Sequence, residues 1–229
     1  MSEAAKRAAG EAAALLVEDG MRIGLGSGST MRFAVRAIGA RIRGQGVTVM
    51  AAATSRDIET LAESCGIALM EPGLHLLDLA LDGADEVEVG RGWLLKGLGG
   101  ALLREKIVAE SSRRFAIVAD CSKLVSHLGA HAPLPVEVVP FGQFATARRL
   151  AALGGAPVLR RDGDGAAFVT DGGNHILDCG GLGPIDDPFT LERRLRAVAG
   201  VVATGLFLRP VERVFVGQAD GSVRTLCFP

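Results

Sequence analysis

One segment, Gly24–Thr30, combines glycines and hydroxyl side chains in a way that could bind an anion. It lies between an expected strand and an expected helix and presents the hydroxyls of Ser27, Ser29 and Thr30. Glycines let the backbone turn tightly and approach a ligand closely, and a helix start offers free N–H groups that suit a phosphate. The spacing matches neither the P-loop nor the dinucleotide-binding fingerprint. A phosphate site and a purely structural turn both remain open for this segment alone.

Two carboxylates follow an apolar segment further along the chain. Asp82 and Asp85 are separated only by Gly83 and Ala84. In a parallel sheet, ligands gather at the carboxyl ends of the strands, so both carboxylates could point into one cleft. A solvated turn or a helix cap is an equally simple interpretation, and no nearby histidine supports a metal site.

A lysine and a run rich in glycine, Lys96–Gly100, lead into an expected helix that carries Arg104, Glu105 and Lys106. Successive residues of a helix are about 100° apart, so these three charges cannot share one face. At least one of them is therefore expected to point away from bulk solvent. Lys123 follows another apolar segment and stands near the expected carboxyl end of a strand.

The elements that must position these residues alternate between strand and helix. They are a helix over 3–19 with Ser2 as its N-cap, strands over 21–25, 47–52, 68–70, 76–81 and 115–119, helices over 30–43, 55–64 and 100–111, and a hairpin over 87–95. This order is typical of a parallel sheet covered by helices.

A second region has an order like β-α-β-β-α-β, with five short strands over 136–139, 158–161, 167–170, 176–179 and 201–206 and helices over 142–153 and 188–199. Such an order is typical of a small α+β sandwich. Strands over 211–216 and 223–228 follow it. The sequence therefore predicts an α/β fold with two parts. A Rossmann-like parallel-sheet domain spans 1–128 plus 207–229, and a smaller inserted α+β, ferredoxin-like lobe spans 129–206.

Composition excludes several classes of function. The 229 residues carry 25 basic and 26 acidic side chains, and this balance argues against a general nucleic-acid binder. No apolar run approaches the roughly 18–20 residues that cross a bilayer, so we expect no membrane association. The four cysteines are widely spread and include no C-x-x-C pair, which favours a reducing, cytoplasmic compartment.

Taken together and in order, these motifs resemble the type A ribose-5-phosphate isomerase family. The resemblance rests on Gly26–Thr30, Asp82–Glu86, Lys96–Lys106 and Ala119–Lys123, and it extends to Leu134–Val138 and Gly200–Phe207. Each motif alone is modest, but the ordered set covers essentially the whole chain.

The resemblance implies an enzyme that interconverts ribose 5-phosphate and ribulose 5-phosphate through an enediolate, without a metal or an organic cofactor. It implies that Glu105 is the general base, and that Asp82, Asp85 and Lys96 surround the reacting oxygens. The residues it implies for binding the sugar phosphate are Ser27, Gly28, Ser29, Thr30, Gly83, Ala84, Gly97, Leu98, Gly99, Lys123 and Lys6. It also implies a homodimer or a dimer of dimers, with the smaller lobe at the interface.

Two departures and two alternatives accompany this resemblance. Ser27 stands where many members carry Thr, which keeps the hydroxyl, and Leu98 interrupts a glycine run. A non-catalytic sugar-phosphate sensor could share the fold, but it would have no use for Glu105, Lys96 and two aspartates together. A related acyl-CoA transferase or amino-sugar-phosphate deaminase is the other alternative, because fold alone does not determine function.

Overall fold

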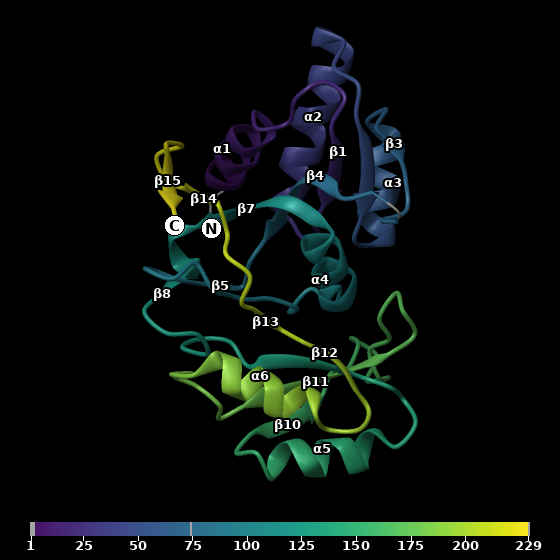
Figure 1. The fold of residues 1–229 in the computed structure, drawn as a ribbon, viewed down its shortest axis with the longest axis vertical. Helices are drawn as coiled ribbons and strands as arrows, with labels where there is room; N and C mark the ends of the chain where they lie inside the picture. The colour runs from purple at the N-terminus through teal and green to yellow at the C-terminus, as the bar shows by residue number, and fades with distance from the viewer. Residues whose placement is uncertain (1–2, 74, 229) are drawn as a thin grey trace. The chain divides into compact units, whose positions relative to one another are not determined.

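The chain forms two compact units in the computed structural model, which describes residues 3–73 and 75–228 (Figure 1). The first unit comprises Met1–Ala84, Arg104–Leu124 and Arg209–Pro229, and the second comprises Asp85–Leu103 and Val125–Leu208. Ser2, the expected N-cap of the first helix, lies outside the described residues.

A seven-stranded sheet in the order β15-β14-β7-β4-β1-β2-β3 forms the centre of the first unit. Its strands are β1 (Arg22–Leu25), β2 (Met50–Ala53), β3 (Ala68–Leu69), β4 (Leu77–Gly83), β7 (Ser112–Asp120), β14 (Arg213–Gly217) and β15 (Val223–Cys227). Every neighbouring pair is parallel except β14 and β15. The predicted α/β class is thus confirmed.

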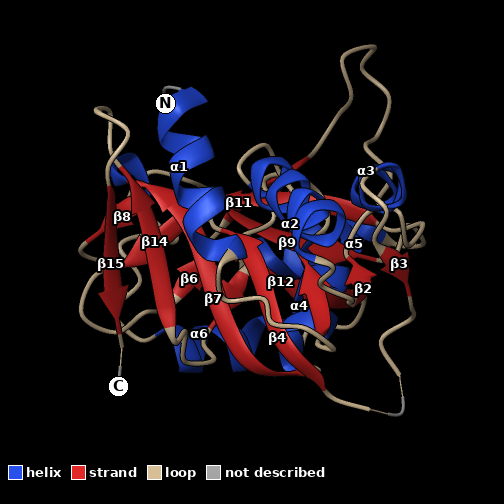
Figure 2. Cartoon of the chain, turned by 90° about the horizontal axis from the view of Figure 1, so that it is seen from above, coloured by secondary structure: helices blue, strands red, loops and turns tan. Residues whose placement is uncertain are grey.

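Helices α1 (Glu3–Ala14), α2 (Met31–Gln45) and α3 (Arg56–Ser64) pack against one face of this sheet, and Figure 2 shows α1 and α2 across its strands. Alternation along the strands explains the packing. Ile23 and Leu25 of β1 belong to the core beneath these helices, so Gly24 points to the opposite face. On that face lies α4 (Leu102–Glu110), and a Cβ at Gly24 would fall 2.3 Å from Val108 of that helix. Within the described residues, no helix is long and apolar enough to cross a membrane.

The second unit contains a four-stranded antiparallel sheet in the order β10-β11-β9-β12. Its elements follow one another as β9 (Leu134–Val138), α5 (Gln143–Ala151), β10 (Ala156–Leu159), β11 (His175–Gly180), α6 (Pro188–Arg196) and β12 (Val201–Thr204). This is the β-α-β-β-α-β order that the sequence predicts, and its spatial arrangement is ferredoxin-like. Val136 and Val138 of β9 pack in one core with Leu150 of α5 and Leu195 of α6.

A second small sheet, in the order β13-β6-β5-β8, explains where the chain divides. Its strands are β5 (Glu86–Glu88), β6 (Leu94–Leu95), β8 (Leu124–Val125) and β13 (Leu206–Phe207). Because β6 pairs with β13, the segment Asp85–Leu103 groups with the second unit. The sequence instead predicts that this segment belongs to the larger domain, 1–128 plus 207–229, because a pairing across more than a hundred residues leaves no local pattern.

Three other elements differ from the sequence-based expectation. Residues 167–170 do not form a strand, and only the isolated bridge between Arg161 and Ala167 remains there. The single strand expected over 201–206 divides at Gly205, whose backbone passes so close to the carbonyl of Lys96 that a Cβ would lie 2.3 Å from it. Helix α1 ends at Ala14 and continues only as turns.

Glu86 holds a long loop in the second unit. Its side chain is 1% exposed and its carboxylate accepts hydrogen bonds from the backbone N–H groups of Gly129 (2.6 Å), His131 (2.7 Å) and Ala132 (2.9 Å). Hydrogen bonds to charged groups contribute more to stability than neutral ones, and a buried donor left without an acceptor is costly. The Glu86 carboxylate therefore fixes the backbone of residues 129–132, which lead into β9.

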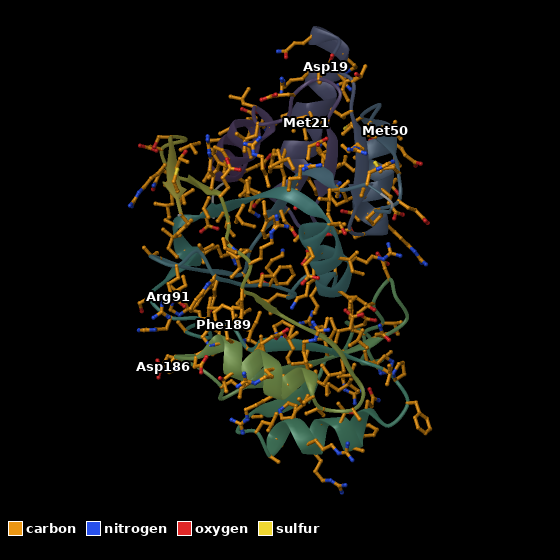
Figure 3. The ribbon with its side chains drawn as sticks, viewed as in Figure 1. Asp19, Met21, Met50, Arg91, Asp186 and Phe189 are labelled. Atoms are coloured by element: carbon orange, nitrogen blue, oxygen red, sulfur yellow. The ribbon has the colours of Figure 1, made fainter. Side chains whose placement is uncertain are left out.

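We predict that Glu86→Gln destabilises the protein by roughly 2 kcal/mol, because the amide keeps one acceptor oxygen but turns an NH₂ group toward backbone donors. For a chain of this size the melting temperature should fall by about 4–8 °C. Thermal unfolding followed by circular dichroism measures the change. Asp186→Asn is the control, since Asp186 is exposed in the same unit (Figure 3) and should melt like the unaltered chain. Equal melting temperatures for both variants would contradict this role of Glu86.

Candidate active site

The glycine-rich turn after β1 lies directly against Asp82 at the end of β4. The N–H of Gly26 donates to the carbonyl of Leu81 at 2.8 Å, and a Cβ at Gly26 would fall 1.9 Å from Asp82 Oδ1. Asp82 is 2% exposed, and its Oδ1 accepts from the N–H of Gly83 at 2.7 Å. Only glycine fits at position 26. The close contact there brings the motif Gly26–Thr30 together with the motif Asp82–Glu86.

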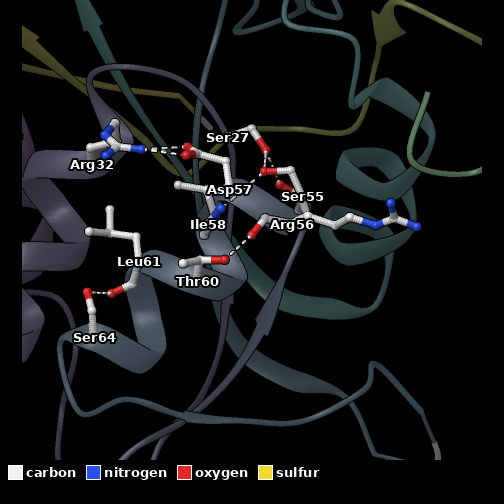
Figure 4. A network of polar contacts seen from close by, with 10 residues as sticks. Ser27, Arg32, Ser55, Arg56, Asp57, Ile58, Thr60, Leu61 and Ser64 are labelled. Atoms are coloured by element: carbon white, nitrogen blue, oxygen red, sulfur yellow. Dashed lines mark hydrogen bonds and ion pairs between the residues drawn. The ribbon is translucent and has the colours of Figure 1, made fainter. Parts of the chain in front are cut away.

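Ser27 belongs to a chain of hydroxyl groups (Figure 4). Its Oγ donates to Ser55 Oγ at 2.9 Å and lies 2.7 Å from Thr54 Oγ1. A serine hydroxyl has one proton, so Thr54 is the donor in the second contact. Ser55 in turn caps α3 by accepting from the N–H of Ile58 at 3.4 Å. The Ser27 hydroxyl is therefore held in one orientation by the start of the neighbouring helix.

Ser29 and Lys6 meet at the start of α2. Lys6 Nζ donates to Ser29 Oγ at 2.7 Å, and both residues line a cavity of about 300 Å³. Gly28, before Ser29, has a φ of +103°, a conformation that favours glycine. Thr30 is the N-cap residue of α2, and its side chain makes no capping hydrogen bond. The geometry thus gathers an ammonium group and hydroxyls at a helix N-terminus, where an anion is stabilised.

Two arginines that belong to none of the sequence motifs line this cavity. Its lining consists of Glu3, Lys6, Ser29, Arg32, Phe33 and Arg36. Arg32 is paired with both carboxylate oxygens of Asp57, at 2.7 and 2.6 Å (Figure 4). Arg36 follows Arg32 by four residues on α2, and this i,i+4 spacing is the signal that could have placed both on one face.

Glu105 lies in the first turn of α4 and is 5% exposed. Lys106 is buried as well, so two of the three successive charges point away from solvent, as the sequence predicts for at least one. Within the first unit, Val108 of this helix packs against Gly24, and Arg104 pairs with Glu59 at 3.4 Å.

The carboxyl ends of β1, β4 and β7 share one edge of the sheet. Gly83 of β4 stands opposite Val118 of β7, so the turn that follows β7 begins near the end of β4. In that turn Asp120 Oδ1 accepts from the N–H of Ser122 at 2.8 Å, and half-buried Lys123 closes the turn. The first unit therefore brings the Gly26–Thr30 turn, Asp82 and Lys123 to one sheet edge, the place where parallel sheets bind ligands.

The second unit holds the remaining candidates, Asp85 and the segment Lys96–Gly100. Asp85 Oδ2 accepts from the N–H of Leu98 at 2.8 Å. Lys96 is buried, and its Nζ lies 5.4 Å from the centroid of the Phe207 ring. Gly97 and Gly100 have positive φ values, +105° and +84°, whereas no described non-glycine residue does. Leu98 therefore interrupts the glycine run at a position where an ordinary backbone conformation suffices.

The candidate residues thus divide between the two units. Asp82 and Glu105 belong to the first, and Asp85 and Lys96 belong to the second. Three peptide bonds separate Asp82 from Asp85, so their Cα atoms lie within about 11 Å of each other. Within residues 3–73 and 75–228, no three His, Cys, Asp or Glu side chains gather as a metal site would require.

We predict that Gly26→Ala destabilises the protein by about 1–3 kcal/mol, because the added methyl group collides with Asp82 and forces the turn or the carboxylate to move. Chemical denaturation followed by far-UV circular dichroism measures the difference. Gly44→Ala is the matched control, since Gly44 lies in α2 with open space around its Cα. That change should be neutral or stabilising by up to about 1 kcal/mol. Equal stabilities for the two variants would show that the contact with Asp82 is not restrictive.

Known ribose 5-phosphate isomerases match this chain in sequence and in structure. A family model described as ribose 5-phosphate isomerase A (phosphoriboisomerase A) matches residues 50–221. The ribose-5-phosphate isomerase A of Thermomicrobium roseum is 51% identical over 221 residues, covering 96% of this chain and 92% of the relative. The structure of ribose 5-phosphate isomerase A from Methanocaldococcus jannaschii superimposes with a TM-score of 0.94 at 39% identity, covering 100% of both chains.

A second solved structure, a D-ribose-5-phosphate isomerase in complex with phospho-erythronic acid, has a TM-score of 0.93 at 32% identity and covers 100% of both chains. These similarities span both compact units and all the motifs described above. The chain belongs to the ribose 5-phosphate isomerase A family.

Proposed function

We propose that this protein interconverts D-ribose 5-phosphate and D-ribulose 5-phosphate. The observation that carries the proposal is the match to isomerases over nearly the full length of the chain at about half identity. The relative that binds phospho-erythronic acid holds a phosphorylated sugar acid. An acid of this kind resembles the enediolate that forms when an aldose becomes a ketose, which supports the same chemistry here.

In this proposal Glu105 is the base. It removes the proton from C2 of the open-chain aldose, and the electron pair moves to give a 1,2-enediolate. Return of the proton to C1 and transfer of a proton from O2 to O1 complete the ketose, so no oxidant or reductant is consumed. A positioned base typically contributes about 10²–10⁴-fold to the rate. The buried site of Glu105 on a helix, within its first turn, suits a carboxylate that must keep one orientation.

We propose that Lys96, Asp82 and Asp85 act on the oxygens of the substrate. A buried ammonium such as that of Lys96 would stabilise the negative charge that develops on the enediolate oxygen. One preorganised donor of this kind contributes about 10²–10³-fold. Asp82 and Asp85 accept hydrogen bonds from neighbouring backbone N–H groups, so their carboxylates are oriented before substrate arrives. They would exchange protons with the hydroxyl groups during ring opening and isomerisation.

We propose that the turn from Ser27 to Thr30, together with Lys6 and Lys123, binds the phosphate end of the substrate. The contact between Lys6 and Ser29 supports this, because it puts a cation and a hydroxyl on one cavity at the start of α2. The remaining implied contacts are Gly83, Ala84, Gly97, Leu98 and Gly99, which would meet the sugar through backbone groups. The alternative of a non-catalytic sensor is less favoured, since the full-length relatives are named as isomerases.

We further propose that the protein acts as a homodimer or a dimer of dimers in the cytoplasm. Exposed aromatic side chains in the smaller unit, Phe141 and Phe144, support an interface with a second copy. Four free cysteines support a reducing compartment. Sedimentation analysis of the purified protein tests the assembly, and a monomer at all concentrations would contradict it.

The isomerase assay tests the proposed reaction, and Glu105→Gln tests the base. The amide cannot accept the C2 proton, so we predict a fall in kcat of about 10²–10⁴-fold while binding of phospho-erythronic acid persists. Glu110→Gln is the control, because Glu110 is an exposed glutamate of the same helix. Its kcat should stay within twofold of the unaltered value. Near-normal turnover in Glu105→Gln would remove Glu105 from the base role.

A chelator provides an independent test of the cofactor-free reaction. Because the enediolate is stabilised by Lys96 in this proposal, activity should be unchanged after treatment with EDTA. Loss of activity with the chelator, restored by a divalent metal, would contradict the metal-free mechanism.

A further inference from the structure

Arg160, just after β10, reaches across the second unit to the backbone of the glycine loop, Lys96–Gly100. Its Nη1 donates to the carbonyl oxygens of Gly97 and Leu98, both at 2.9 Å. Within the loop, the N–H of Gly100 donates to the carbonyl of Gly97 at 3.0 Å. Glycine-rich segments lose the most conformational entropy on ordering, so such a loop depends on an external clamp.

Asp178 and Phe168 fix the guanidinium in its place. Arg160 Nε donates to Asp178 Oδ2 at 2.9 Å, and Nη2 donates to Oδ1 of the same carboxylate. The Arg160 side chain is 13% exposed. The Phe168 ring lies 5.8 Å from the guanidinium carbon and fills the space where a Cβ of Gly100 would stand, 2.4 Å from it. The planar fork of arginine donates four hydrogen bonds here, two to the carboxylate and two to the carbonyls, whereas the ammonium of lysine has only three donors and no fork geometry.

The peptide unit between Gly97 and Leu98 is consequently held at both ends. Its carbonyl accepts from Arg160, and its N–H donates to Asp85 at 2.8 Å. A trans peptide is planar, with its C=O and N–H pointing in opposite directions. Rotation of this unit would break both contacts together. The orientation of the Asp85 carboxylate is thus coupled to the Arg160–Asp178 pair through one rigid peptide.

We propose that Arg160, anchored by Asp178, is a positioning residue for the isomerase reaction. It fixes the glycine loop in the conformation that orients Asp85 and places Lys96. The expected effect on kcat rests on the proposed function. The contact between Arg160 and the glycine loop does not depend on that function. Arg160 acts through the loop and the carboxylate, and the substrate is not its partner.

Four single variants test the proposal: Arg160→Ala, Arg160→Lys, Asp178→Asn and the control Arg161→Ala. Arg161 is an exposed neighbour whose guanidinium donates to the carbonyl of Gly165 in a surface turn. Displacing a catalytic group by about 1 Å can cost on the order of 10²-fold in rate. We therefore expect Arg160→Ala to lower kcat by about 10²-fold, with KM changing less than threefold, and Arg161→Ala to match the unaltered protein.

Arg160→Lys separates positioning from general stabilisation. Lysine keeps the positive charge beside Asp178. The melting temperature of Arg160→Lys should therefore lie closer to that of the unaltered protein than to that of Arg160→Ala. The three N–H donors on the single nitrogen of lysine cannot replace the four bonds that the guanidinium makes to the carboxylate and the two carbonyls, so kcat should remain at least tenfold below the unaltered value. Recovery of kcat in parallel with stability would overturn the proposal, because charge compensation alone would then be the role of Arg160.

Amide hydrogen exchange at Leu98 measures the loop without any substrate. The bond from its N–H to Asp85 should slow exchange in the unaltered chain, and we expect at least tenfold faster exchange in Arg160→Ala and Asp178→Asn. Unchanged exchange in both, or a kcat within twofold of normal in Arg160→Ala, would overturn the proposal. If the unaltered chain did not isomerise ribose 5-phosphate, the proposed function would fail, and the exchange rates would still decide whether Arg160 positions the loop.

Discussion

Carboxylates that accept hydrogen bonds from loop backbone hold the candidate active-site residues of this protein in place. Three of these carboxylates lie in the segment Asp82–Glu86, which runs from the end of β4 to the start of β5. Asp82 accepts from the N–H of Gly83, Asp85 from that of Leu98, and Glu86 from three further amides. Such charge-assisted bonds are about twice as strong as neutral ones, and they satisfy loop donors that would otherwise need water. The same short run of sequence therefore orders the loops and supplies the carboxylates proposed for catalysis.

Close approach of other groups to the glycine backbone is the second constraint, and it explains glycines that a phosphate motif alone would not explain. Gly24 admits Val108 of α4, Gly26 admits the carboxylate of Asp82, and Gly205 passes beside the carbonyl of Lys96. At each position a methyl group would collide with a residue far away in the sequence. These glycines are steric requirements of the packing, whereas Gly28 and Gly97 are needed for their positive φ.

Features that a local sequence pattern determines could be predicted, whereas features that depend on contacts between distant residues could not. Strand-to-helix order gave the parallel sheet, and the β-α-β-β-α-β order gave the antiparallel sheet of the second unit. The turns after β1 and β4 could be found because glycine and carboxylate cluster at strand ends. Arg160 could not be found, because its partners at Gly97 and Leu98 lie some sixty residues away and no local pattern marks it. The grouping of 85–103 with the second unit was missed for the same reason, since it depends on pairing with β13.

In the proposed reaction, this chain isomerises a sugar phosphate by moving a proton through an enediolate. Conversion of ribose 5-phosphate in D₂O, followed by NMR of the ribulose 5-phosphate formed, is the decisive experiment. A carboxylic acid exchanges its proton with solvent while the intermediate is bound, so we expect measurable deuterium at C1 of the product. Product without deuterium above background would indicate direct hydride transfer from C2 to C1 and would contradict proton transfer through an enediolate, as would the absence of product.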